Sequence, residues 1–176
     1  MAKEPKIKAL SSDVAAGSPT SDQSSKSAAA PPRKIPGNLP YLNASGVLKK
    51  ALDGLIEASR PDKFNSDFLE NVLKITGGSG RATIPILKRL GFLTSDGAPT
   101  DVYARFRTDG GRGQAALQAL KVGFPEIFKR SEYAHSVEDV KLRDIILEIT
   151  GLKPSDQIAT AIKNTFNVIK NTSQME

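Results

Sequence analysis

Apolar side chains recur at helical spacing along most of the chain after residue 38. The first such run predicts a helix over residues 46–58, in which Leu48, Leu52 and Leu55 share one face. Similar runs follow, down to a last helix that carries Ile158 at the start of its apolar face. We therefore expect a mainly α protein.

Residues 66–93, SDFLENVLKITGGSGRATIPILKRLGFL, combine a short apolar helix, a glycine-rich turn and a second helix. Asn65 is expected to cap the first helix, and the run of glycines that begins at Gly77 is expected to end it. The second helix is expected over residues 79–91, with apolar side chains on one side and basic ones opposite. Pro85 lacks a backbone donor and should kink this helix or mark a later start. The pattern is typical of a helix-turn-helix.

Asp96-Gly97, directly after this pattern, is a hairpin turn signal and predicts a minimal wing. The second half of the chain predicts helices only. Residues 73–77 and 147–151 both read L-[KE]-I-T-G. Two readings follow from this repeat: the C-terminal half is a second helix-turn-helix unit, or it is an ordinary helical hairpin that also contains Thr-Gly.

Composition separates a tail from the folded part. Residues 1–38 are rich in Ser, Ala, Pro, Gly and Lys and hold too few large apolar groups to offset the entropy of ordering, so we expect a disordered tail. Residues 39–110 are expected to form a winged helix-turn-helix-like unit. Residues 111–176 are expected to form a helical C-terminal unit packed on the first.

The chain has 176 residues and no cysteine. Disulfides, thiolate zinc sites and a cysteine nucleophile are therefore excluded, and a reducing compartment fits this composition. The N-terminus lacks the apolar region of a secretory signal, and no apolar run approaches the roughly 20 residues of a membrane helix. We expect a cytoplasmic protein without a membrane partner.

The net charge of +6 is distributed unevenly. Residues 74–112 carry seven basic and three acidic side chains, whereas residues 113–176 carry eight of each. The positive excess of the folded part thus lies in the turn, the second helix and the segment after it. Such a patch attracts phosphates.

The candidate DNA-binding residues follow from this charge and from the glycine turn. Backbone N–H groups near the start of the second helix can hold a phosphate, and cations on its exposed side can follow a DNA groove. Arginines after the wing can reach flanking phosphates. The predicted set is Gly78, Ser79, Gly80, Arg81, Lys88, Arg89, Arg105, Arg107 and Arg112. The alternative reading is an ordinary solvated helix face beside a flexible turn.

Catalytic chemistry has little support in the sequence. His135 is the single histidine, and it precedes a helix-capping serine, which favours a structural role. The acids show no clustered metal-ligand spacing, and no nucleophile elbow is present. We expect a protein that is not an enzyme and that has no catalytic residue, no metal and no cofactor.

Four stretches resemble a prokaryotic family of uncharacterised proteins, the domain of unknown function 5343. They are LPYLN, DFLENVLKITGGSGRATIPILKRLGFLTSDGAPT, FPEIFKRSEYAHSVEDVK and ITGLKPSDQIATAIKNTF, which together span about residues 39–171. The resemblance implies a small helical protein of the helix-turn-helix type and a bacterial origin. It also implies that Pro85 belongs to the fold, and it supplies no catalytic or binding residue.

Two functions from different classes remain after these observations. The first is a non-enzymatic protein that binds double-stranded DNA, as a regulator, through the basic face of residues 79–91. The second is a protein-protein interaction module built on a winged-helix scaffold, with a protein partner or a second copy of the chain bound. Fold alone does not decide between them.

Overall fold

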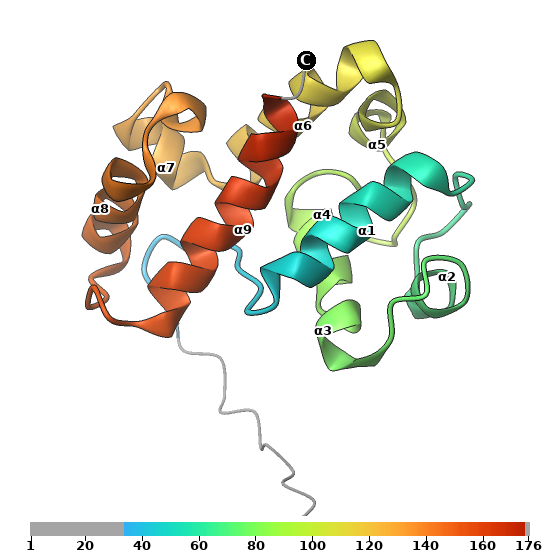
Figure 1. Ribbon diagram of the computed structural model, residues 1–176, viewed down its shortest axis with the longest axis horizontal. Coiled ribbons are helices and arrows are strands. Elements are labelled where there is room, and N and C mark those ends of the chain that lie inside the picture. Colours follow the sequence, from blue (N-terminus) through green and yellow to red (C-terminus); the bar gives the residue numbers. More distant parts are fainter. Residues whose placement is uncertain (1–33, 175–176) are drawn as a thin grey trace, which may run out of the picture. The chain divides into compact units, whose positions relative to one another are not determined.

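The computed structural model describes residues 34–174, and these residues are mainly helical (Figure 1). This confirms the expected fold class at the level of a mainly α protein. The expected disordered tail over residues 1–38 lies, except for its last five residues, outside the described range. Within that range, the extended pairing amounts to one isolated antiparallel bridge between Leu93 and Pro99.

Nine α-helices and two short 3-10 turns cover the described residues. In chain order they are α1 (Ser45–Glu57), α2 (Ser66–Asn71), α3 (Gly77–Arg81), α4 (Thr83–Arg89), α5 (Asp101–Phe106), η1 (Asp109–Gly111), α6 (Arg112–Gly123), α7 (Pro125–Arg130), η2 (Ala134–Ser136), α8 (Asp139–Thr150) and α9 (Gln157–Ser173).

Helix α2 begins as expected and ends earlier than expected. The side chain of Asn65 accepts a hydrogen bond from the backbone N–H of Phe68 at 2.9 Å, which confirms the predicted cap. The helix stops at Asn71, because the chain turns at Lys74, whose φ of 56° lies in the left-handed region. The predicted end at Gly77 is therefore wrong.

The long second helix of the sequence pattern is divided into α3 and α4 at Ala82. Pro85 explains the division, because it has no N–H to donate to the carbonyl of Arg81 one turn earlier. The break that the proline predicts is confirmed. Gly91 ends the pair with a φ of 81°.

The two L-[KE]-I-T-G segments have different conformations. Lys74 lies in the turn between α2 and α3, and Gly77 is the first residue of α3; both have positive φ. By contrast, Glu148 lies inside α8, and Gly151 ends that helix in the left-handed conformation at φ 66°. The shared L-[KE]-I-T-G sequence therefore does not adopt the same structure in residues 73–77 and in residues 147–151.

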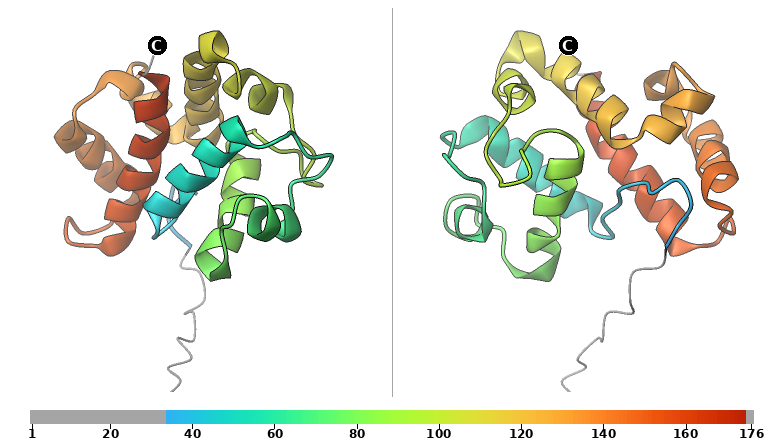
Figure 2. Two further views of the ribbon diagram at one scale, coloured as in Figure 1. Left: turned by 45° about the vertical axis from the view of Figure 1, so that its right-hand side comes forward. Right: turned by 180° about the vertical axis from the view of Figure 1, so that it is seen from behind.

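Helix α9 packs against α1, α6 and α8, as the views in Figures 1 and 2 show. The N-terminal segment before α1 is tied to it by the backbone N–H of Leu42, which donates to Oγ1 of Thr165 at 3.0 Å in a buried position. Side chains from both halves of the described chain thus share one hydrophobic core.

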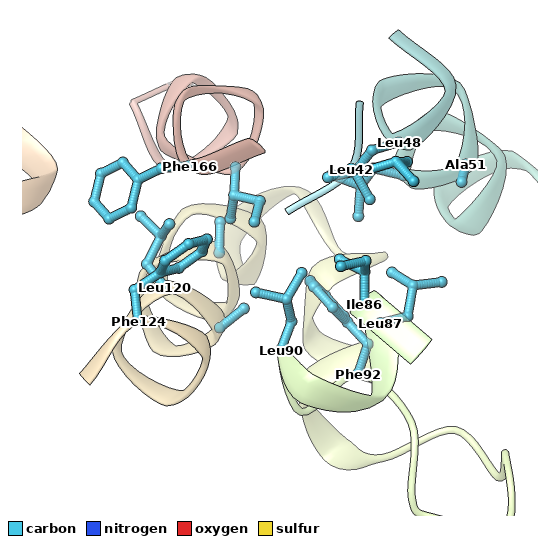
Figure 3. Packing of buried hydrophobic residues seen from close by; sticks show 14 of the residues in the cluster. Leu42, Leu48, Ala51, Ile86, Leu87, Leu90, Phe92, Leu120, Phe124 and Phe166 are labelled. Atoms are coloured by element: carbon cyan, nitrogen blue, oxygen red, sulfur yellow. The ribbon is translucent and has the colours of Figure 1, made fainter. Parts of the chain in front are cut away.

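Figure 3 shows this shared core between α1, α4, α6 and α9. Leu90, directly after α4, reaches toward Leu120 of α6 and Phe124, the residue after α6. Phe124 meets Phe166 of α9 in an edge-to-face contact at 5.2 Å between ring centroids. Leu48 completes the packing from α1. Because Ile86 and Leu87 of α4, and Leu90 directly after it, are buried in the core, the opposite side of α4 is left for solvent.

Candidate nucleic-acid interface

Arg81 projects from the end of α3 and is held by α2. Its Nε and Nη2 donate to Oε1 of Glu70 at 3.2 and 3.0 Å. The side chain of Arg81 remains 64% exposed. The side chain of Arg81 is therefore accessible to solvent, although it is already paired with the carboxylate of Glu70.

Lys88 and Arg105 are the two predicted cations whose side chains have no hydrogen bond or ion pair with other described residues. Lys88 lies half-buried in α4, and Arg105 is exposed in α5. The ammonium group of Lys88 and the guanidinium group of Arg105 are thus free to bind a ligand. Lys63, an exposed residue before Phe64, has the same property and was missed by the sequence argument. Its isolated position outside the basic segment gave no signal.

Asp96 lies in the loop of residues 94–98, close to both Lys63 and Lys88. The hydroxyl of Thr94 donates to the carboxylate of Asp96, and this hydrogen bond is the main cause that lowers the pKa of Asp96. A backbone hydrogen bond and the positive charges of Lys63 and Lys88 lower that pKa further. Asp96 is thus a carboxylate at neutral pH, and it partly offsets the charge of the two lysines.

The loop of residues 94–98 is short and is held against the body of the protein. The backbone N–H of Phe64 donates to the carbonyl oxygen of Gly97 at 2.8 Å, and a Cβ on Gly97 would lie 3.0 Å from the oxygen of Phe64. Gly97 also has a φ of 91°, so both space and conformation call for glycine. The loop is a closed turn against residue 64.

Arg89 serves the fold. Its Nη2 donates to the backbone carbonyl of Asn38, a residue with a φ of 45°, and so fastens the segment before α1 to α4. Burial lowers the pKa of Arg89, although a guanidinium stays charged at neutral pH. The charge remains, but the side chain is directed at the protein's own backbone.

Arg107 and Arg112 also donate to main-chain carbonyls. Nη2 of Arg107 donates to the oxygen of Ala58, just after α1, at 2.8 Å. Nε of Arg112 donates to the oxygen of Phe106, at the end of α5, at 3.2 Å, and its Nη2 donates to Asp109 at 2.9 Å. Both arginines satisfy carbonyls at helix ends that lack a helical donor.

The glycine turn contains two different environments. Gly78 and Ser79 are exposed, and a Cβ on Gly78 would meet nothing within 4 Å. Gly80 is buried, and a Cβ there would lie 2.9 Å from Cγ2 of Ile75. Gly80 is therefore needed for close packing, whereas Gly78 and Ser79 are open to a ligand.

Lys74 is a second residue that the sequence argument missed. It is exposed in the turn before α3, and its side chain has no partner within residues 34–174. Its positive φ is uncommon for a residue with a Cβ and costs free energy in this place. It adds a cation to the turn that precedes α3.

Neither metal binding nor membrane insertion finds support in the described residues. No group of three or more His, Cys, Asp or Glu side chains within residues 34–174 is placed to hold a metal ion. The ring of His135 stacks on Phe128 with centroids 6.4 Å apart. None of the helices described is both long and apolar enough to cross a membrane.

Comparison with known proteins places the chain in a family. The model of the family of unknown function DUF5343 matches residues 40–176. No curated protein matches the chain, and no solved structure does. Since the match covers most of the sequence, the chain belongs to DUF5343.

Proposed function

We propose that this member of DUF5343 binds the phosphate backbone of double-stranded DNA with the exposed side of α3 and α4. The observation that carries the proposal is that Lys63 and Lys88 both lie close enough to Asp96, in the loop after α4, to lower its pKa, while Arg81 ends the preceding helix α3. The elements around these three cations follow one another as α2, a turn, α3 with α4, and a loop closed by a β-bridge. This order of elements is typical of a winged helix-turn-helix.

This proposal retains fewer DNA-contacting residues than the sequence predicted. Arg89, Arg107 and Arg112 donate to backbone carbonyls, so they contribute positive potential without contacting a phosphate. Gly80 contributes packing. Lys88, Arg81, Lys63 and, at the edge, Arg105 remain to contact phosphates.

The same geometry favours binding through the backbone of DNA over reading of its bases. Phosphate contacts position a protein and carry no sequence information. The described face offers cations, while the planar amides that read adenine do not lie among the proposed residues. We therefore propose weak, salt-dependent binding with little sequence preference, which would suit a protein whose specificity is supplied elsewhere.

Titration of the full chain with a mixed-sequence duplex at two salt concentrations tests this function. The proposal expects saturable binding that weakens steeply as salt rises, because about one counterion is released for each phosphate contacted. Absence of binding at low salt, or binding that is insensitive to salt, would contradict it.

A second candidate function, protein-protein interaction, is favoured by a groove between α1 and the two residues that follow α2. Val72 lines it and is 51% exposed, which is unusual for a large apolar side chain in these helices. The groove has a volume of about 350 Å³, and its lining residues are Lys50, Asp53, Gly54, Glu57, Ala58, Val72 and Leu73.

A pull-down with the full chain tests the second candidate. Val72→Ser should lose a stoichiometric protein partner. Val140→Ser should retain it, because Val140 is an equally simple exposed valine, 70% exposed, on the distant helix α8. Equal recovery with both variants would exclude this groove as the binding surface.

A further inference from the structure

The turn between α2 and α3 depends on a left-handed residue at position 74. Lys74 has a φ of 56° there, and the next residue, Ile75, donates its backbone N–H to the carbonyl oxygen of Leu69 at 3.0 Å. Carbonyls near the end of a helix lack a helical donor, so this hydrogen bond satisfies one of those of α2. The positive φ thus closes the helix and returns Ile75 to the buried core.

Lysine is a poor residue for this conformation. A residue with a Cβ loses free energy in the left-handed region, whereas glycine adopts it readily and often follows the end of a helix for that reason. The other described residues with positive φ follow this rule, since they are Asn38, of a type that tolerates the region, and five glycines, Gly37, Gly77, Gly91, Gly97 and Gly151. Lys74 is the exception, and strained residues of this kind cluster where a side chain binds a ligand.

Packing on both sides fixes the place of Lys74. Before it, Leu73 packs on Gly54 of α1, where a Cβ would lie 2.7 Å from Cδ2 of Leu73. After it, Ile75 packs on Gly80 of α3, where a Cβ would lie 2.9 Å from Cγ2 of Ile75. Lys74 itself is exposed, and its ammonium group has no hydrogen bond or ion pair with another residue in 34–174. The backbone is therefore held in advance while the charge stays open to a ligand, which reduces the entropy lost on binding.

The same packing brings Lys74 close to Arg81. The carbonyl oxygen of Ile75 would lie 3.3 Å from a Cβ on Gly80, so the two backbones touch at this point. Lys74 directly precedes Ile75, and Arg81 directly follows Gly80. The two cations are thus each one residue away from one backbone contact, and together they concentrate positive charge at this end of the element.

We propose that the side chain of Lys74 contacts a backbone phosphate of the duplex. This contact rests on the proposed function, and it adds the turn between α2 and α3 to the surface formed by Lys63, Arg81 and Lys88. Helix-turn-helix proteins lay the first helix of the element across the DNA backbone, so in that arrangement the turn after α2 lies within reach of the phosphates. The free energy lost to the left-handed φ then serves to hold a charge at this turn.

Lys74→Gly in the full chain gives the direct test, because stability and duplex affinity should change in opposite directions. Glycine relieves the left-handed strain, so the unfolding temperature should rise by about 2–4 °C. Loss of the ammonium group should weaken binding of a mixed-sequence duplex and reduce the slope of log affinity against log salt by about 0.9, which corresponds to one phosphate contact. An unchanged slope, or a lower unfolding temperature, would overturn the proposal.

Two further variants separate the charge at position 74 from the loss of any lysine. Lys74→Arg keeps the charge and should keep the salt slope of the parent. Lys153→Gly is the matched control, because Lys153 is also an exposed lysine in a loop after a helix, outside the left-handed region. It should raise neither the unfolding temperature nor the affinity, and should leave the slope unchanged. If either variant loses as much affinity as Lys74→Gly, Lys74 is not a phosphate contact.

The parent chain, titrated beside the variants, distinguishes failure of this contact from failure of the proposed function. If the parent does not bind the duplex at low salt, the proposed function is wrong, and the contact of Lys74 is wrong with it. If the parent binds and Lys74→Gly binds with the same affinity and salt slope, the duplex is held by other residues and only the contact of Lys74 is wrong.

Discussion

Arg81 and Glu70 form an exposed ion pair that joins the two helices of the proposed DNA-binding element. Nε and Nη2 of Arg81 share Oε1 of Glu70, at 3.2 and 3.0 Å. An exposed pair of this kind contributes about 0–1 kcal/mol, because water screens the attraction. A phosphate can therefore replace the carboxylate, and Glu70 should act as an internal competitor of DNA.

Glu70→Gln should strengthen duplex binding. The change releases Arg81 and removes one negative charge, and an affinity gain of up to about fivefold is expected from the strength of an exposed ion pair. Fluorescence anisotropy with a labelled duplex at low salt measures the effect. Glu57→Gln removes an exposed charge from α1 away from Arg81, and it should change the affinity less. If Glu70→Gln weakens binding, Glu70 is not a competitor.

Lys88→Ala should weaken duplex binding without affecting stability. The side chain has no partner in residues 34–174 to lose, so the unfolding temperature should stay within error of the parent. The slope of log affinity against log salt should fall by about 0.9, which corresponds to one lost phosphate contact. An unchanged slope would show that Lys88 does not touch DNA.

Arg107→Ala, in contrast to Lys88→Ala, should lower stability and leave most of the duplex affinity. The guanidinium donates to the carbonyl of Ala58, and loss of a hydrogen bond from a charged group destabilises by about 1.5–3 kcal/mol. Urea denaturation followed by circular dichroism should detect this loss. At temperatures where the variant is folded, its duplex affinity should fall only modestly, since a distant charge is lost. A large affinity loss with full stability would instead place Arg107 at the interface.

Gly78→Ala and Gly80→Ala should separate the open and the packed part of the glycine turn. A Cβ on Gly80 would lie 2.9 Å from Ile75, so this change should destabilise the fold, by about 1–3 kcal/mol as for overpacking elsewhere. Gly78 has open space and lies in a helix, so alanine should stabilise by about 0.5–1 kcal/mol. Thermal unfolding of both variants is the measurement, and equal effects would contradict the described packing.

Local signals in the sequence were sufficient for much of the fold. Asn65 caps α2 and Pro85 divides α3 from α4, because each acts through hydrogen bonds or backbone conformations of its immediate neighbours. Lys74 shows the limit of such signals. It takes a left-handed conformation that glycine prefers, so α2 ends before the glycines that were expected to stop it.

The roles of the arginines could not be read from the sequence. A basic residue on the exposed side of a helix looks the same whether it faces a phosphate or a carbonyl of its own chain. Arg89 meets Asn38 across 51 positions, and Arg107 meets Ala58 across 49. Only the folded chain brings those carbonyls within reach, so charge patterning overestimated the number of side chains free to contact DNA.

The most direct test of the proposed function compares two triple variants of the full chain that carry the same net charge. One changes Lys63, Arg81 and Lys88 to alanine on the proposed face. The other changes Lys121, Lys141 and Lys153, three exposed lysines of the C-terminal half, to alanine. Duplex titrations at two salt concentrations should show binding abolished in the first variant and nearly retained in the second. Equal losses in both would mean that total charge, and not the face of α3 and α4, attracts the duplex.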